Sequence, residues 1–381
     1  MIYLDNAATT FPKPPGTLEL AVERYRELGV SPGRGNHDLA MRASDAVEAV
    51  RAQVAAFFGA PDAERVVFGA NATDALNTAI LGLVRPGDHV VTTRLEHNSV
   101  LRPLHHLAET GAITWDAAPC DEDGIVRPDA VEALLRPATR CVVMTHASNV
   151  IGTVQPVAEI ASRCAAHGIP VIVDAAQSAG QIPIDMAATG IAALAFTGHK
   201  SLYGPSGIGG LVVMPSLEVE TSRFGGTGMD SASLTHTRDY PLRLEAGTLN
   251  LLGVIGLGLG LDFVTAEGVE AIHAREAALL GRLRDGLAAI EGVTLYRADG
   301  DPLDRVGVLA CNVDGVHPQD AGAILDGDFD IAVRVGVHCA PLVHEDLGTI
   351  NRGAVRFSLG AFTTEVDIDA AIEAMRAIAG G

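Results

Sequence analysis

The sequence predicts an α/β fold: a large domain with a mostly parallel seven-stranded sheet flanked by helices, and a smaller C-terminal α+β domain. Short apolar runs alternate with segments of helical periodicity up to about residue 250, and such long connections are typical of crossover units in a parallel sheet. Polar residues follow several apolar runs, where the carboxyl ends of parallel strands line a ligand crevice. After residue 250 the order of helices and strands changes, which indicates a second unit.

The large domain is expected to span residues 17–260. An N-terminal arm, 1–16, holds a short strand at 2–5 and then a proline-rich turn, which cannot continue a helix. Apolar residues at helical spacing predict helices at 18–28 and 40–58, separated by a glycine-rich loop at 31–37. The seven strands are expected at 66–68, 89–93, 113–115, 141–145, 171–173, 194–196 and 211–214, with helices near 74–83, 99–109, 128–135 and 157–167.

The small domain is expected to span residues 261–381, joined by the N-terminal arm. Its predicted helices lie at 251–266, which begins before the boundary, and at 269–290, 318–325 and 365–378. Its predicted strands lie at 293–296, 308–313, 331–335 and 354–359.

Composition restricts the classes of partner and compartment. The net charge of −20 argues against nucleic acid as a main partner. The longest apolar run, 251–261, is too short to span a bilayer, so no membrane partner is expected. No signal peptide is visible, and the five scattered cysteines form no CxxC pair, which predicts reduced thiols in a cytoplasmic protein. The histidines lack metal-ligand spacing, so no metal site is expected.

Lysine is rare in this chain. Of the 27 lysine and arginine residues, only Lys13 and Lys200 are lysine. Arginine stays protonated, whereas a desolvated lysine can lose its proton and form a Schiff base, so Lys200 is either an imine-forming amine or an incidental surface charge. Pyridoxal phosphate (PLP) chemistry needs such a lysine and an acid that keeps the pyridine nitrogen protonated. Asp174, which follows the run at 171–173, is the candidate acid; alternatively it is a helix cap or a loop carboxylate.

Two segments together carry a family resemblance. Asp174-Ala-Ala-Gln177 and, after a spacer, Phe196-Thr-Gly-His-Lys200 resemble the cofactor segment of the class V aminotransferase family, in particular the cysteine desulfurases. The resemblance extends over nearly the whole chain. It implies the fold-type I arrangement of PLP enzymes, with PLP bound to Lys200 and its ring nitrogen held by Asp174.

The resemblance also implies roles for other residues around the cofactor. Asn71-Ala72-Thr73 follows a strand and opens a helix, where free N–H groups bind anions; the alternative is an ordinary N-cap. In the family this tripeptide binds the phosphate. Further positions match phosphate ligands (Thr197, His199 and, from the other subunit of a homodimer, Thr248), a ring-stacking histidine that shuttles protons (His97), and side chains that contact the phenolic oxygen or the substrate (Asn149, Gln177).

Cys339 distinguishes between reactions. It lies in Arg334-Val-Gly-Val-His-Cys-Ala340, which resembles the catalytic loop of the Suf-type desulfurases. Positive neighbours lower the pKa of a thiol, and Arg334 and His338 are expected to do so here. Arg356 matches the family's clamp for the substrate carboxylate, a role that suits a bidentate guanidinium. Arg334, Asn149 and the loop residues Asn36 and His37 are the other expected substrate contacts.

The reaction implied by the resemblance converts L-cysteine to L-alanine, with sulfur left on Cys339 as a persulfide. An acceptor protein or a small thiol then takes the sulfur; an iron–sulfur scaffold, a tRNA-thiolation protein and a biosynthetic pathway all remain open. Alternatives are a selenocysteine lyase, a C–S lyase, an epimerase, or a non-catalytic scaffold with the same fold. Asn98-Ser99 departs from the Suf-type pattern, which leaves the substrate preference open.

Overall fold

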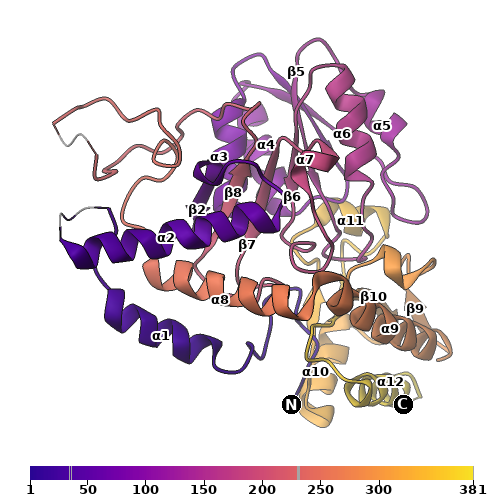
Figure 1. Ribbon diagram of the computed structural model, residues 1–381. Helices are drawn as coiled ribbons and strands as arrows, with labels where there is room; N and C mark the ends of the chain where they lie inside the picture. Colours follow the sequence, from indigo (N-terminus) through magenta and orange to yellow (C-terminus); the bar gives the residue numbers. More distant parts are fainter. Residues whose placement is uncertain (34, 36, 230–231, 381) are drawn as a thin grey trace.

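The large domain is built on a seven-stranded sheet in which only β8 runs against its neighbours (Figure 1). The computed structural model describes residues 1–33, 35, 37–229 and 232–380. In sheet order the strands are β2 (Val66–Gly69), β8 (Gly209–Val213), β7 (Ala193–Thr197), β6 (Val171–Asp174), β5 (Thr139–Thr145), β3 (His89–Thr93) and β4 (Thr114–Ala118). All seven predicted strands are therefore confirmed, and so is the mostly parallel sheet.

Helices cover both faces of this sheet because its central strands are apolar on both sides. One face packs against α3 (Ala72–Leu83) and α4 (Asn98–Glu109). The other packs against α2 (Asp38–Phe57), α5 (Pro128–Glu132), α6 (Val157–Ala166), α7 (Met186–Thr189) and α8 (Leu251–Glu267). The sequence did not predict α7, because four residues are too few to show helical periodicity.

Helix α8 lies between α2 and α1 (Thr17–Leu28) and supports the turn that follows β7 (Figure 1). Its glycines allow close packing, since a Cβ at Gly260 would collide with the carbonyl oxygen of Leu202. Within the described residues no single helix is long and apolar enough to cross a membrane. Only α8 and α9 (Val269–Ala288) pass that test as a pair, and a 75° bend separates them.

The small domain contains a four-stranded antiparallel sheet in the order β12 (Arg334–Gly336), β13 (Ala354–Ser358), β10 (Val308–Val313) and β9 (Val293–Leu295). Its helices are α9, α10 (Pro318–Phe329), α11 (Pro341–Asp346) and α12 (Glu365–Gly380). The sequence did not predict α11, which is also short.

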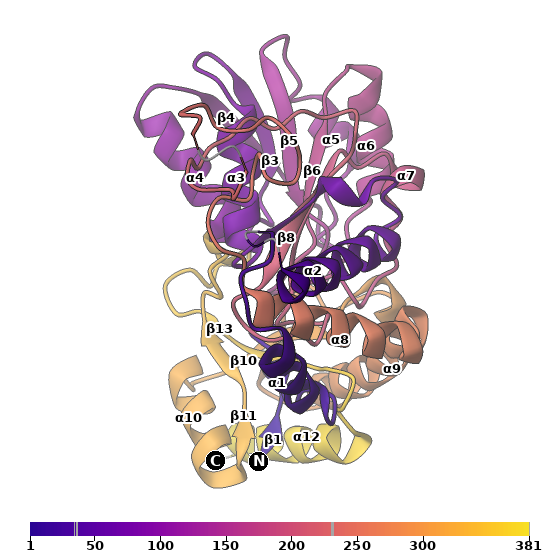
Figure 2. The same ribbon diagram turned by 60° about the vertical axis from the view of Figure 1, so that its left-hand side comes forward.

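One predicted strand, 331–335, is wrong as a single element. Residues Ile331–Ala332 form β11, which pairs in parallel with the arm strand β1 (Ile2–Tyr3), whereas β12 joins the four-stranded sheet. The apolar run changes partners within one residue because the N-terminal arm crosses the domain there. Both termini consequently lie at the small-domain end of the molecule (Figures 1 and 2). The predicted boundary at 260/261 falls inside α8 and stays a prediction.

Candidate active site

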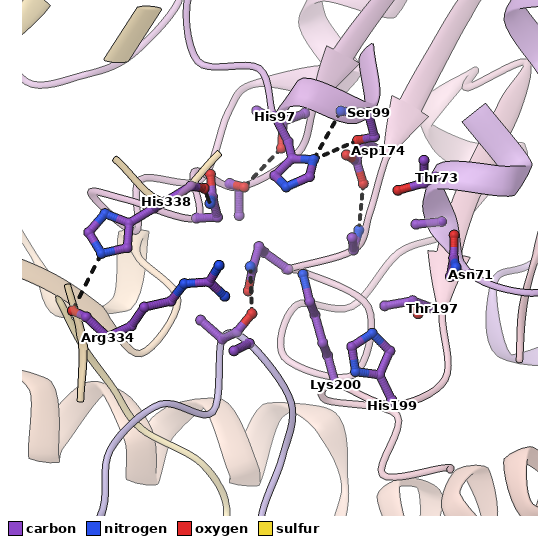
Figure 3. A pocket seen from close by; sticks show the side chains of 18 of the residues that line it. Asn71, Thr73, His97, Ser99, Asp174, Thr197, His199, Lys200, Arg334 and His338 are labelled. Atoms are coloured by element: carbon purple, nitrogen blue, oxygen red, sulfur yellow. Dashed lines mark hydrogen bonds between the residues drawn. The ribbon is translucent and has the colours of Figure 1, made fainter. Parts of the chain in front are cut away.

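A cavity of about 270 Å³ lies at the carboxyl ends of β3, β5, β6 and β7 (Figure 3). It brings together most of the residues predicted to form the site: Ala72, Thr73, His97, Asn149, Asp174, Gln177, Thr197, His199, Lys200, Arg334 and Arg356. Parallel strands end at one edge of the sheet, which is why residues more than a hundred positions apart meet here. Cys339, Thr248 and His37 do not line this cavity.

Lys200 extends from the turn after β7 into the middle of the cavity (Figure 3). Burial lowers the pKa of its amine to about 8, and the positive charges of Arg356 and Arg334 act in the same direction. The carboxylate of Asp174 opposes the shift. A substantial fraction of the amine is therefore neutral near physiological pH, as an imine-forming lysine requires.

Asp174 is buried at the end of β6, with one carboxylate oxygen accepting the backbone N–H of Ala176 at 2.9 Å. Burial raises its pKa, whereas that hydrogen bond and the charge of Lys200 lower it. A buried carboxylate at a cavity wall is stabilised by a cationic N–H partner. The protonated ring nitrogen of PLP is such a partner, so Asp174 fits this cofactor.

The opposite end of the cavity fits a phosphate. Asn71 caps α3 by accepting the N–H of Asp74 at 3.0 Å, so the N–H groups of Ala72 and Thr73 remain at the helix terminus for an anion. The hydroxyl of Thr197 is buried and has no hydrogen-bond partner within the described residues. Gly209 lets β8 pass Asn71 closely, since a Cβ there would lie 2.8 Å from the Asn71 Cα. An anion here would satisfy the Thr197 hydroxyl.

His97 is the N-cap of α4 and lines the cavity. Its Nδ1 accepts the backbone N–H of Ser99 at 3.0 Å and lies 2.9 Å from the Ser99 hydroxyl oxygen. Burial, with the charges of Lys200 and Arg334, lowers the pKa of His97 to about 4. The imidazole is therefore neutral, and the bond from the Ser99 N–H places its proton on Nε2. Sequence reasoning did not select Ser99 as a site residue, although its position two residues after His97 suits a helix cap.

Two arginines from the small domain line the cavity, Arg356 and Arg334, and Figure 3 shows Arg334. Arg356 is buried and donates to Asp5 Oδ1 at 2.7 Å and to the carbonyl oxygen of Asn149 at 3.0 Å, while its Nε has no partner within the described residues. Arg334 is exposed at the mouth of the cavity. Together they suit an anionic substrate group such as a carboxylate.

Cys339 is partly exposed and directly follows His338, which lines the cavity. The loop is held on both sides of the thiol: Asn149 Nδ2 donates to the carbonyl oxygen of His338 at 2.6 Å, and the N–H of Asn98 donates to that of Cys339 at 2.7 Å. These bonds hold His338 and Cys339 at φ values of 50° and 57°, a strained conformation for residues other than glycine.

The expected role of His338 as a positive neighbour of the thiol is wrong. Burial, followed by the charge of Arg356, lowers the pKa of His338 far below its ordinary value, so its ring is neutral. The ring packs against His344, with His338 Nδ1 and His344 Nε2 3.2 Å apart. Sequence spacing did not reveal this pair, because α11 brings His344 back beneath the loop.

Two further predicted positions lie elsewhere. Thr248 lines a second cavity of about 300 Å³, beside Gly33 and Thr227. His37 is exposed and caps α2, with its Nδ1 accepting the N–H of Ala40 at 3.2 Å. Asn36 lies outside the described residues. The site roles of these three residues stay predictions.

Comparisons with known proteins agree with this geometry. The sequence profile of the family described as aminotransferase class-V matches residues 2–371. The chain is 35% identical to a probable cysteine desulfurase from Methanothermobacter thermautotrophicus, over 100% of this chain and 95% of that protein. It is also 35% identical to a cysteine desulfurase from Pectobacterium atrosepticum, over 99% of this chain and 93% of that protein. The apo structure of the cysteine desulfurase from Thermococcus onnurineus NA1 matches with a TM-score of 0.93 at 34% identity, covering 100% of this chain and 95% of that one. This chain therefore belongs to the class V aminotransferase family.

Proposed function

We infer that this protein is a PLP-dependent cysteine desulfurase that converts L-cysteine to L-alanine and transfers the sulfur to an acceptor. The observation that carries this inference is the position of Lys200. Its amine, with a pKa lowered to about 8, shares one cavity with the buried carboxylate of Asp174. A partly exposed cysteine, Cys339, adjoins the same cavity through His338.

The residues that would hold PLP are Lys200 for its aldehyde carbon, Asp174 for its ring nitrogen and the α3 terminus with Thr197 and His199 for its phosphate. His97 lies beside the ring position, and Asn149 and Gln177 are the expected contacts of the phenolic oxygen. When bound, the cofactor supplies an electron sink for the substrate carbon skeleton.

Each of the remaining steps is assigned to a side chain of this protein. Arg356 and Arg334 orient the substrate carboxylate. The Lys200 amine accepts the α-proton, and the neutral ring of His97 can give or take a proton at Nε2. The Cys339 thiolate attacks the substrate sulfur, so an S–S bond forms while the Cβ–S bond breaks. The electron pair of the broken bond goes to Cβ, and a proton added there completes alanine, which leaves a persulfide on Cys339.

Replacing Cys339 by alanine tests this mechanism. We expect Cys339→Ala to lower alanine and sulfide formation from L-cysteine by more than about 100-fold, because none of the other four cysteines is a sequence neighbour of a cavity-lining residue. The visible absorption band of the bound cofactor should persist. Cys120→Ala is the matched control, since Cys120 is also partly exposed but lies outside the cavity.

Cysteine, selenocysteine and cystine should be compared in the same assay. Full sulfur release from cysteine by Cys339→Ala would contradict the persulfide step. Activity of that variant on selenocysteine alone would favour a selenocysteine lyase, and activity on cystine would favour a C–S lyase.

We also propose that the enzyme acts as a homodimer in the cytoplasm. Reduced cysteines support the compartment, since all five are free. The acceptor is a protein or a small thiol, with iron–sulfur cluster assembly as one destination. An assay that transfers persulfide sulfur to candidate acceptor proteins tests this assignment.

A further inference from the structure

The second lysine of the chain has no role in the mechanism above. Lys13 lies in the N-terminal arm and does not line the cavity. Its ammonium donates to the carbonyl oxygen of His199 at 2.8 Å and to the hydroxyl of Thr10 at 2.7 Å. His199 directly precedes Lys200, so this bond attaches the arm to the peptide that carries the imine-forming lysine.

Several donors from the arm converge on this peptide. The carbonyl oxygen of His199 also accepts the backbone N–H of Thr10 at 3.0 Å and the hydroxyl of Thr9 at 3.0 Å. The Thr10 hydroxyl accepts from Lys13 and lies 3.0 Å from the carbonyl oxygen of Lys200. A carbonyl oxygen has two lone pairs, so the donors of Thr9, Thr10 and Lys13 saturate it and fix the plane of the peptide.

The same arm contacts the rest of the cavity. Asp5 pairs with Arg356 at 2.7 Å, and the carbonyl oxygen of Ala7 accepts Gln177 Nε2 at 3.1 Å. Ala7 and Ala8 themselves form part of the cavity wall. Residues 5–13 therefore form a clamp, which we call the arm clamp, between the expected carboxylate site and the Lys200 turn.

A lysine suits the contacts made at position 13, although arginine is the cation at almost every other place in the chain. An ammonium is a compact charge with three rotatable donors, whereas a guanidinium is a wide planar fork. Lys13 is partly buried, and burial lowers its pKa to about 8. Its charge reaches the site, since it contributes with burial and Lys200 to lowering the pKa of His199.

We propose that Lys13 is a positioning residue that, through the arm clamp, fixes the His199–Lys200 peptide and keeps the Lys200 amine desolvated in the cavity. This proposal rests on the proposed function only in taking Lys200 as the imine-forming amine. Without the clamp, the turn has fewer bonds on its arm side, and water reaches the amine. Restored hydration favours the protonated amine of Lys200.

The test measures the titration of Lys200 in the full-length enzyme after its cofactor has been removed. Reductive methylation with formaldehyde and cyanoborohydride over a range of pH, read by mass spectrometry, reports each amine separately. Because Lys13 and Lys200 are the only lysines, Lys200 is the only one left in Lys13→Met. The wild-type midpoint is expected near the lowered pKa of about 8. We expect Lys13→Met to raise it by about one pH unit.

Three further variants distinguish the effect of the positive charge at residue 13 from the effect of the hydrogen bonds to the His199 carbonyl oxygen. Lys13→Arg keeps the charge but not the compact donor, so it should raise the midpoint by less. Thr9→Ala removes an uncharged donor to the same carbonyl and should also raise it. Arg24→Met removes an exposed charge from α1 and should leave the midpoint unchanged. Circular dichroism verifies that each variant is folded.

A Lys13→Met midpoint equal to that of the wild type would overturn the proposal, as would an equal rise in Arg24→Met. The readout needs neither cysteine nor cofactor. The two proposals can therefore fail separately. If the wild type lacks desulfurase activity but Lys13→Met still raises the midpoint, the proposed function is refuted and the role of the arm clamp is supported.

Discussion

Neutral imidazoles surround the cavity, and burial is the main cause. His97 and His199 both have a pKa lowered to about 4. Charge at the site is therefore concentrated on Lys200, Asp174 and the two arginines. If PLP binds as proposed, the neutral imidazoles would leave the strongest electrostatic interactions to Asp174 and the two arginines.

A second buried acid, Glu276 on α9, gives a prediction about stability and pH. Neither of its carboxylate oxygens has a hydrogen-bond partner within the described residues. Burial raises its pKa to about 8 from an ordinary value of 4.5. Between these two pH values the folded state binds more protons than the unfolded state, so the free energy of unfolding falls as pH rises through this window. This carboxyl should contribute a decrease of about 3–5 kcal/mol.

Urea unfolding between pH 5 and pH 8.5 measures this decrease. Glu276→Gln should show a smaller loss of stability with rising pH than the wild type, because the amide does not titrate. Glu270→Gln, at an exposed position on the same helix, should behave like the wild type. Parallel pH profiles for wild type and Glu276→Gln would show that Glu276 is not the group responsible.

Among the helices, α2 and α3 allow a matched test of the proposed phosphate site at the start of α3. Each has a capping side chain, His37 for α2 and Asn71 for α3, but only the start of α3 faces the cavity. Replacing either cap by alanine should lower the free energy of unfolding by about 1 kcal/mol. Only Asn71→Ala should also speed the release of PLP, measured by dialysis against a cofactor trap.

Equal loss of cofactor in both variants would contradict this difference between the helices. A specific rise in the KM for cysteine in His37→Ala would instead support the substrate role predicted for that residue.

The elements also show where sequence patterns are sufficient. Strands β3, β5, β6 and β7 were predicted because their apolar runs are buried on both faces, and hydrophobic burial is encoded residue by residue. The run 331–335 divides between β11 and β12, because its pairing partners, the N-terminal arm and β13, come from opposite ends of the chain. A local sequence pattern does not predict which distant strand a segment will pair with.

For the whole molecule, the position of Thr248 gives a prediction about assembly. Thr248 is outside the cavity of its own chain and lines a separate cavity with Gly33 and Thr227. If it reaches the phosphate of a second subunit, Thr248→Ala should weaken PLP retention several-fold although no contact within its own chain's site changes. Sedimentation of the wild type should show a dimer, and Ser44→Ala, at the same cavity, is a control.

A monomer in solution at the enzyme concentrations that give activity would exclude this arrangement. Unchanged retention of PLP in a dimeric Thr248→Ala protein would remove Thr248 from the site while leaving the dimer in place.

Apolar periodicity and residue type are local properties, so the chain's pattern alone predicted the seven strands and placed Lys200 and Asp174 at the ends of two of them. Tertiary structure alone decided that His338 is neutral against His344, that Ser99 fixes the proton of His97, and that Lys13 contacts the peptide before Lys200. Each of these depends on burial or on distance between separate segments. Burial and the distances between segments are set by how the whole chain packs, so they cannot be predicted from a run of neighbouring residues.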